Sequence, residues 1–186
     1  MSEHVCPWWL GYFLINPLRR FKQDPGEILS PYVRQGMTVL EPGPGMGYFT
    51  LELARRVGPS GRVVTVDIQA KMLQKLERRA AKQRLLERIE TRLVQKDSMG
   101  LGDLKETVDF ALAFAVVHEL PDGSRFFAEI SEALKPGAFL LLAEPRGHVK
   151  QTKFEAELKA AAGAGLNFRN GPAISSSHSA LFQRAA

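Results

Sequence analysis

The residues best suited to chemistry form a glycine-rich turn after a short apolar run. The segment Val39–Phe49 reads VLEPGPGMGYF, so an acid and three glycines precede a helical pattern. Glycine tolerates positive φ and lets main-chain N–H groups approach a ligand closely. The amino terminus of a helix adds partial positive charge, which favours a carboxylate or a phosphate. The segment therefore predicts a binding loop for the polar end of a ligand.

The spacing of this loop separates two kinds of ligand. Dinucleotide-binding loops follow the pattern G-x-G-x-x-G. Here Gly43, Gly45 and Gly47 give G-x-G-x-G, and Glu41 stands two residues before the first glycine. A carboxylate at that position would repel a pyrophosphate but suits an ammonium group. The loop therefore indicates a ligand with an amino-acid-like end.

Two further acids follow other expected strands. Asp67 ends the run Arg62–Asp67, and its carboxylate can accept hydrogen bonds from both hydroxyls of a ribose. Asp97 follows the run Ile89–Gln95 and can accept one from an adenine amino group. Open α/β sheets bind ligands at the carboxyl ends of their strands. Either acid alone could instead cap a helix or sit in a solvated turn. Together with Glu41 they describe an amino-acid end, a ribose and an adenine.

These side chains need a scaffold that brings strand ends together, and the sequence alternates short apolar runs with helical patterns. The expected strands are Thr38–Glu41, Arg62–Asp67, Ile89–Gln95, Val108–Phe114 and Phe139–Ala143. The expected helices are Tyr48–Val57, Ala70–Arg84, Ser124–Leu134 and Thr152–Ala162. Such alternation is typical of a doubly wound α/β fold with a mostly parallel sheet. Nothing helical separates Asn167–Ile174 from Ser179–Arg184, so we expect an antiparallel hairpin at the sheet edge.

From about Gly36 onward the sequence resembles the class I S-adenosylmethionine-dependent methyltransferases. Val39–Gly47 is similar to the first motif of that family, Val63–Asp67 to the second and Lys96-Asp97-Ser98 to the adenine-side motif. Leu134–Ala138 is similar to the turn before strand five. The resemblance implies a Rossmann-like, seven-stranded sheet with an antiparallel last strand. It also implies that S-adenosylmethionine is the cofactor, with Glu41 near its methionine part and Asp67 on its ribose. Further cofactor contacts are expected from neighbours of these motifs and from the fourth strand, namely Phe49, Ile68, Ser98, Ala113 and Phe114.

The loop after the fourth expected strand carries the candidate catalytic residues His118 and Glu119. Histidine has a pKa suited to a general base near neutral pH. The alternative is that the pair shapes the loop or caps the next helix. Glu144 and His148 follow the fifth strand and are further candidates for the acceptor pocket. The spacing of these histidines and acids matches no compact ligand motif, so we expect no metal site.

The first 36 residues form a separate segment before the cofactor-binding domain, which we place at 37–186. They contain Cys6-Pro7-Trp8-Trp9, and aromatic side chains at this density are costly to expose. We expect either a strap packed on the domain or a lid over the acceptor. A short helix is expected at Pro25–Val33, with Pro25 in its first turn.

Composition and charge limit the cellular location and the binding partners that we expect for this chain. The chain has one cysteine, which excludes an intrachain disulfide and fits a reducing cytoplasm. The apolar run Val5–Ile15 is too short to span a bilayer and lacks a signal-peptide flank. The net charge of +5 is dispersed, and the basic residues between Lys71 and Arg84 fit the solvated face of a helix. We therefore expect no membrane or nucleic-acid partner and leave the oligomeric state open.

The predicted function is methyl transfer from S-adenosylmethionine to a small molecule. Family members that methylate nucleobase or glutamine amino groups carry an Asn/Asp-Pro-Pro-Tyr/Phe segment after the fourth strand. This sequence has Phe114-Ala115-Val116-Val117 there, which argues against such an acceptor. The alternatives are a macromolecular acceptor, a nicotinamide-dependent oxidoreductase and a non-catalytic partner subunit that binds S-adenosylmethionine.

Overall fold

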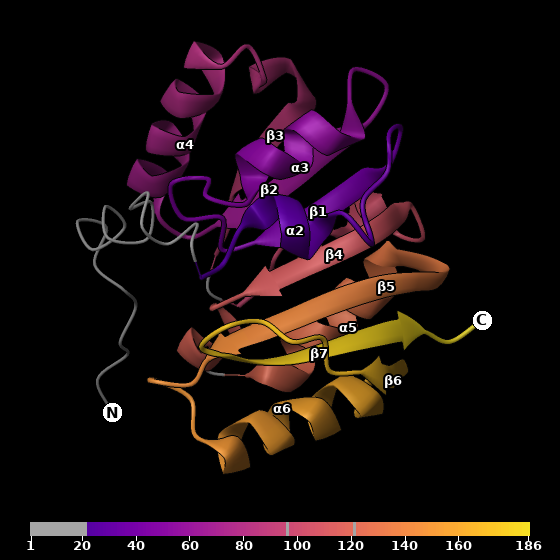
Figure 1. The fold of residues 1–186 in the computed structure, drawn as a ribbon. Helices are drawn as coiled ribbons and strands as arrows, with labels where there is room; N and C mark the ends of the chain where they lie inside the picture. The colour runs from indigo at the N-terminus through magenta and orange to yellow at the C-terminus, as the bar shows by residue number, and fades with distance from the viewer. Residues whose placement is uncertain (1–21, 96, 121) are drawn as a thin grey trace. The chain divides into compact units, whose positions relative to one another are not determined.

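The computed structural model describes residues 22–95, 97–120 and 122–186 (Figure 1). The chain divides into two compact units, residues 1–95 and 96–186, which are described separately below as unit 1 and unit 2. The predicted aromatic strap or lid around Trp8 and Trp9, together with Cys6, lies outside the described residues.

Unit 1 is a parallel three-stranded layer with helices. Its strands run in the order β3-β2-β1 with parallel register. The elements are α2 (Pro25–Leu29), β1 (Thr38–Pro42), α3 (Thr50–Val57), β2 (Arg62–Asp67), α4 (Ala70–Lys82), the 3-10 turn η3 (Leu86–Arg88) and β3 (Ile89–Leu93). The two long helices are amphipathic, and their apolar faces are buried. Because α3 follows β1 in the chain, the glycine-rich turn lies between these two elements.

The start of α2 shows how the described part of the amino-terminal segment is held. Asp24 caps the helix by accepting hydrogen bonds from the N–H groups of Gly26 (2.6 Å) and Glu27 (3.3 Å). Pro25 occupies the first helical position, as predicted. The Arg56 guanidinium donates to the Gly26 carbonyl at 2.7 Å and joins α2 to α3. Residues 22–36 are thus attached to unit 1, and the division of the chain at residue 36 stays a prediction.

Unit 2 contains four strands in the order β4-β5-β7-β6. Its elements are η4 (Gly102–Leu104), β4 (Val108–Phe114), η5 (Val117–Glu119), α5 (Gly123–Ala133), β5 (Leu134–Pro145), α6 (Gln151–Gly163), β6 (Leu166–Asn170) and β7 (Ser177–Arg184). β4 and β5 are parallel, whereas β7 is antiparallel to both β5 and β6. The predicted antiparallel hairpin is therefore confirmed. The centre of β5 is fully buried, as its apolar sequence predicts.

Several predicted strand boundaries were wrong, including the end of β3 and the start of β5. β3 ends at Leu93 and not at Gln95, so Asp97 lies in an exposed turn beyond the strand. β5 begins at Leu134, before the turn that we expected to precede it. The register shifts between the pairs Val108–Leu134 and Phe110–Phe139, and Gly137 has φ 78°. The expected turn is thus an irregularity inside the strand, which a glycine at positive φ permits.

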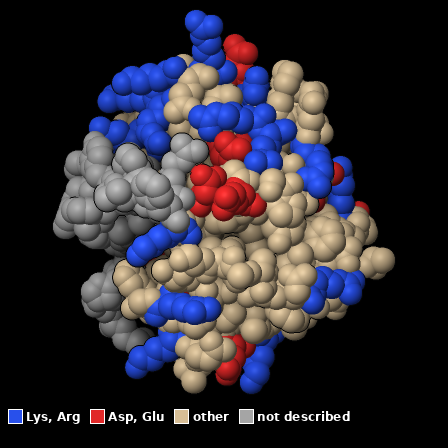
Figure 2. Space-filling view, in the orientation of Figure 1, with Lys and Arg blue, Asp and Glu red and all other residues tan. Residues whose placement is uncertain are grey.

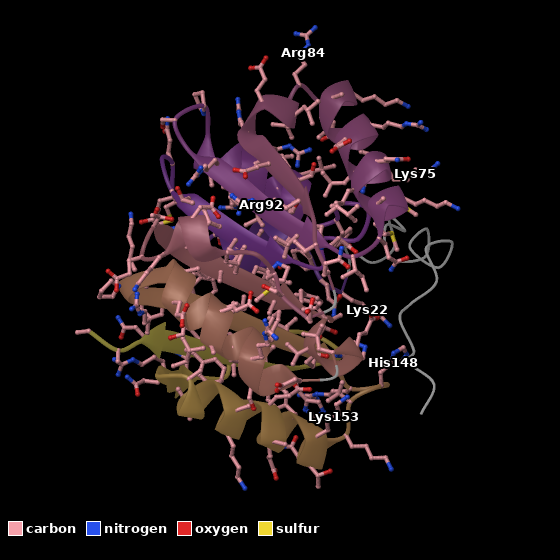
Figure 3. The ribbon with its side chains drawn as sticks, turned by 180° about the vertical axis from the view of Figure 1, so that it is seen from behind. Lys22, Lys75, Arg84, Arg92, His148 and Lys153 are labelled. Atoms are coloured by element: carbon pink, nitrogen blue, oxygen red, sulfur yellow. The ribbon has the colours of Figure 1, made fainter. Side chains whose placement is uncertain are left out.

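Basic side chains gather on α4 in unit 1, and Figure 2 shows the blue surface over this helix. Lys75 and Arg84 extend away from the ribbon in Figure 3. Lys71, Arg78 and Lys82 are exposed, in agreement with the predicted solvated face. Among the described residues, no helix combines the length and the apolar character needed to cross a membrane.

Candidate functional site

The glycine-rich turn of unit 1 has the backbone geometry that its sequence predicts. Gly43, Gly45 and Gly47 have φ values of 66°, 55° and 82°. The Gly43 N–H donates to the Val66 carbonyl at 2.9 Å, which joins the turn to β2. A Cβ atom added at Gly47 would lie 3.0 Å from Leu76 Cγ. Both the positive φ and the closeness of α4 therefore require glycine at this position.

Glu41 is a deeply buried acid beside the glycine-rich turn. Its side chain, at the end of β1, is 3% exposed. The Thr50 hydroxyl in the first turn of α3 donates to Glu41 Oε2 at 2.6 Å. Burial raises the pKa of Glu41 to about 8, and the hydrogen bond from Thr50 opposes this only in part. Below about pH 8 the carboxyl is therefore protonated until a cation supplies a counter-charge.

Asp67 lies beside this turn, because it follows Val66, whose carbonyl accepts from the turn. Asp67 Oδ1 accepts a hydrogen bond from the Gln69 N–H at 2.8 Å. The bond closes a turn between the end of β2 and Gln69, the N-cap residue of α4, which has no side-chain cap, and it fixes the orientation of the carboxylate. The neighbouring Ile68 is 36% exposed. Phe49, by contrast, is buried and packs edge-to-face on Tyr48 with ring centroids 5.2 Å apart.

Arg79 on α4 anchors the glycine-rich turn through the main chain of the turn. Its guanidinium Nη1 donates to the Met46 carbonyl, inside the glycine-rich turn. Burial lowers the pKa of Arg79 from its ordinary value, although arginine remains charged at neutral pH. From its sequence, Arg79 is expected on the solvated basic face of α4. One member of that face instead fixes the conformation of the turn.

Replacing Arg79 with methionine should loosen the turn and weaken binding of S-adenosylmethionine about 5- to 30-fold, because about 1–2 kcal/mol of hydrogen bonding is lost. Arg78→Met is the matched control, since Arg78 is exposed on the same helix. Calorimetric titration of both variants with S-adenosylmethionine measures the difference. Equal affinities in the two variants would contradict the anchoring role.

The adenine-side residues Asp97 and Ser98 belong to unit 2. Asp97 is exposed, whereas Ser98 is engaged with α5. Glu129 Oε2 accepts from the Met99 N–H at 2.8 Å and from the Ser98 hydroxyl at 3.3 Å. The sequence analysis did not identify Glu129, whose carboxylate fixes this turn.

The carboxyl end of β4 leads into a strained loop. Ala113 is fully buried and Phe114 is half-buried. Ala115 follows at φ 56°, a left-handed conformation that alanine rarely adopts. Its N–H donates to the Ala143 carbonyl at 2.8 Å, so the strained residue is held by β5. Strain of this kind is concentrated at functional sites.

This loop places His118 against Glu144, not against its sequence neighbour Glu119. The His118 Nδ1 atom hydrogen-bonds Glu144 Oε2 at the end of β5. Glu144 is fully buried, and its Oε1 accepts from the N–H groups of Val116 (3.1 Å) and Val117 (2.8 Å). Two candidates that the sequence analysis named separately thus form one pair. Glu119 lies nearby and acts on His118 through its charge.

Further ionisable groups from α6 surround this pair. Glu157 is 6% exposed, and neither of its carboxylate oxygens has a hydrogen-bond partner among the described residues. Burial raises the pKa of Glu157 to about 7, and the charge of Glu144 adds to this. Lys153 donates to the His118 carbonyl at 2.9 Å. His148, exposed in the segment before α6, has its ring centroid 6.1 Å from that of His118 (Figure 3).

No metal-binding arrangement of three or more His, Cys, Asp or Glu side chains occurs within residues 22–95, 97–120 and 122–186. His178, which pairs with Glu144 across β5 and β7, is occupied elsewhere. Its Nε2 lies 3.1 Å from the Val149 carbonyl, and its ring stacks on Phe154.

Sequence reasoning does not identify Thr50, Glu129 or Glu157 as site residues, and it places Arg79 on a solvated face. Each is an ordinary helical residue in the sequence, and only tertiary packing brings it to the site. A faint signal exists for Glu157, since an acid at a position expected to be buried on an amphipathic helix is unusual.

Comparison with known proteins identifies a family and several relatives that match part of this chain. The model of a family described as "Methyltransferase domain" matches residues 34–175. An arsenite methyltransferase of Halobacterium salinarum is 31% identical over 109 residues, 59% of this chain and 27% of the relative. A demethylmenaquinone methyltransferase of Lactobacillus johnsonii is 33% identical over 104 residues, 56% of this chain and 42% of the relative. The chain thus spans well under half the length of these two relatives.

A solved structure is similar over nearly the whole chain. The SAM-dependent methyltransferase from Aquifex aeolicus superposes with a TM-score of 0.84 at 23% identity, covering 96% of this chain and 98% of the other. This likeness concerns the fold. It confirms the expected Rossmann-like α/β architecture, a mostly parallel seven-stranded sheet with an antiparallel last strand.

Proposed function

This chain belongs to the methyltransferase-domain family of class I S-adenosylmethionine-dependent methyltransferases, and on that premise we propose that it transfers a methyl group from S-adenosylmethionine to a small-molecule acceptor. The acceptor class is suggested by the relatives, whose names refer to arsenite and demethylmenaquinone, both small molecules. A reducing cytoplasm remains the expected location, since the chain has one cysteine.

The buried carboxyl of Glu41 is the observation that carries the proposal. A pyrophosphate at the glycine-rich turn would supply no counter-charge to this acid, so the carboxyl would stay protonated and its ionised form would gain nothing from a nicotinamide dinucleotide. An ammonium group would instead stabilise the ionised form of Glu41. S-adenosylmethionine offers such a group at its methionine end. Asp67 is the proposed partner of its ribose hydroxyls.

The sulfonium of the cofactor carries the intrinsic reactivity for methyl transfer. The protein contributes mainly by holding the nucleophile and the methyl carbon in near-attack geometry, an effect of up to roughly 7–11 kcal/mol. Of the residues predicted to bind the cofactor, Glu41 and Asp67 belong to unit 1, whereas Asp97 and Ser98 belong to unit 2, as does the candidate acceptor residue His118.

The proposal is tested by calorimetric titration of the purified chain with S-adenosylmethionine, S-adenosylhomocysteine and NAD in parallel. Micromolar binding of the first two without NAD would support the cofactor assignment. Binding of NAD alone would favour an oxidoreductase and overturn the interpretation of Glu41. Binding of S-adenosylmethionine by a chain that acts only with a co-purifying protein would favour the partner-subunit alternative.

Replacing Asp67 with alanine should weaken binding of S-adenosylmethionine by about 1–3 kcal/mol, roughly 5- to 150-fold, because a charged hydrogen-bond acceptor is removed. Asp67→Asn separates this effect from the loss of the bond to the Gln69 N–H, since asparagine keeps an acceptor oxygen for that N–H. Titration calorimetry measures both affinities. Wild-type affinity in the alanine variant would rule out the ribose role.

A further inference from the structure

We propose that His118 and Glu144 form the proton-accepting centre of the acceptor site, with Glu157 as a second polar wall, and that the acceptor therefore reacts through a hydroxyl group. The inference rests on the proposed function, since it concerns the acceptor of the same methyl transfer. It names the class of acceptor as a phenol or an enol.

The hydrogen bonds of Glu144 determine which nitrogen of His118 can take a proton. Glu144 Oε1 is saturated by two main-chain N–H groups, so the carboxylate is held in place without side-chain freedom. Oε2 faces His118 Nδ1, and an ionised carboxylate can only accept there. The network therefore assigns the proton to Nδ1 and leaves Nε2 as the basic nitrogen. The side chain of His118 is 15% exposed, so a ligand can reach it.

Glu157 indicates that this cluster is built for a ligand. Its carboxyl group is more than nine-tenths buried, yet both oxygens lack a hydrogen-bond partner among the described residues. A buried polar group without partners costs free energy that packing alone would not require. The charges of Glu144, His118 and Lys153 all act on Glu157, so it belongs to the same cluster. A polar ligand at His118 would give these oxygens a donor.

The backbone strain at Ala115 supports the same conclusion. The left-handed residue turns the chain out of β4 three positions before His118, and the Glu144 carboxylate then captures Val116 and Val117. The fold therefore holds a strained loop in the one conformation that aims His118 Nδ1 at Glu144.

The charges around His118 make it a stronger base than an isolated imidazole. Burial alone would lower the pKa of His118, but the hydrogen bond and charge of Glu144, together with the charge of Glu119, raise it above its ordinary value. Lys153 opposes this rise from α6, where Glu157 also lies, and His148 lies beside the ring. Glu144 thus serves as the positioning residue that stabilises the imidazolium.

The proposed step balances as an in-line displacement. The acceptor O–H gives its proton to His118 Nε2, and the oxygen electron pair of the resulting nucleophile forms a bond to the methyl carbon. The carbon–sulfur bond breaks, and its electron pair stays on sulfur as S-adenosylhomocysteine. Solvent then takes the proton from the imidazolium.

The basicity of His118 favours a hydroxyl acceptor over other nucleophiles. A thiol has a pKa of about 8.5 and ionises with little help, and a neutral amine attacks before it loses a proton. A phenol resembles the tyrosine side chain, with a pKa of about 10, and gains most from a base. Of these three nucleophiles, only the phenol needs an anchored His–Glu pair as its base.

The test compares three acceptors of matched shape, 1-naphthol, 1-naphthalenethiol and 1-naphthylamine, with radiolabelled S-adenosylmethionine and the full chain. We expect transfer to 1-naphthol to fall about 100-fold or more in His118→Asn, the range of general-base effects. The apparent pKa of the naphthol reaction should fall in Glu144→Gln. Glu157→Gln should reduce the rate about 3- to 10-fold through one lost polar contact, whereas Glu155→Gln, an exposed position on the same helix, should not.

The outcomes separate this inference from the proposed function. Naphthol transfer that survives His118→Asn would overturn it, as would transfer to the thiol or the amine without transfer to the naphthol. If none of the three is methylated, modification of the histidines by diethyl pyrocarbonate, mapped by mass spectrometry, decides. A reactive His118 whose pKa in NMR titration falls in Glu144→Gln supports the centre, and an unreactive His118 overturns it. Failure to bind S-adenosylmethionine would instead count against the proposed function.

Discussion

Replacing Glu41 with glutamine is expected to weaken binding of S-adenosylmethionine about 100-fold or more, because breaking a buried ion pair costs about 3–5 kcal/mol. The carboxyl is 3% exposed and lies against the glycine-rich turn, where the proposed ammonium group would meet it. Glutamine keeps the shape and an acceptor for the Thr50 hydroxyl but cannot carry the charge. Titration calorimetry at about pH 7.5 measures the loss, with Glu52→Gln on the solvent side of α3 as the control.

The same substitution should stabilise the cofactor-free protein. The pKa of Glu41 is raised to about 8 in the folded state, so the folded chain binds this proton more tightly than the unfolded chain does. The free energy of unfolding therefore falls as pH rises from the ordinary glutamate pKa toward about 8. Glutamine removes this dependence, and we expect it to stabilise the protein by about 2–4 kcal/mol at pH 8, and little at pH 4. Urea denaturation at the two pH values measures the difference.

Proton release provides an independent check on Glu41. At about pH 6.5 the carboxyl is protonated in the free protein, and the arriving ammonium group would displace that proton. Binding enthalpies measured in buffers of different ionisation enthalpy should show close to one proton released by the wild type and none by Glu41→Gln. Binding without proton release would show that the ammonium group does not meet Glu41.

The cofactor half of this site follows from local sequence. A strand that ends in an acid, three glycines at alternate positions and an amphipathic helix specify a turn almost by themselves, since only glycine fits where α4 approaches Gly47. Asp67 was predictable because strand ends are marked by the switch from β-branched residues to a helical pattern. The sheet was predictable for the same reason, apart from boundaries such as the start of β5, where a strand continues through a proline and a glycine.

The acceptor half depends on contacts between residues distant in sequence. His118 stands next to Glu119, and local reasoning pairs the two. The structure pairs His118 with Glu144, 26 residues away, because β4 and β5 are adjacent and parallel and end at the same edge. Glu157 joins them only because α6 packs on α5, β6 and β7 and is tied to the His118 carbonyl through Lys153. Spacing within the sequence carries no signal for such pairs, which tertiary packing alone creates.

The largest effect on stability should come from Glu144→Ala. The substitution removes the acceptor of two main-chain N–H groups and of His118 Nδ1, and unsatisfied buried donors cost about 1–3 kcal/mol each. Because relaxation of the loop recovers part of this, we expect a loss of about 2–5 kcal/mol in the free energy of unfolding. Glu155→Ala, on the exposed side of α6, should change it by less than about 0.5 kcal/mol.

The pH dependence of that loss distinguishes the ion pair from the loop contacts. The pKa of His118 is raised in the folded state, so its charged interaction with Glu144 stabilises the fold fully below the ordinary histidine pKa and is lost as pH rises through the raised value. The deficit of Glu144→Ala should therefore be greatest near pH 6 and smaller near pH 9, where the neutral hydrogen bond from His118 Nδ1 and the bonds from Val116 and Val117 remain but the charged interaction is lost. Urea denaturation across this range measures both components. A deficit that is the same at both pH values would assign Glu144 to the loop alone, and His118 would then lack the partner that makes it a base.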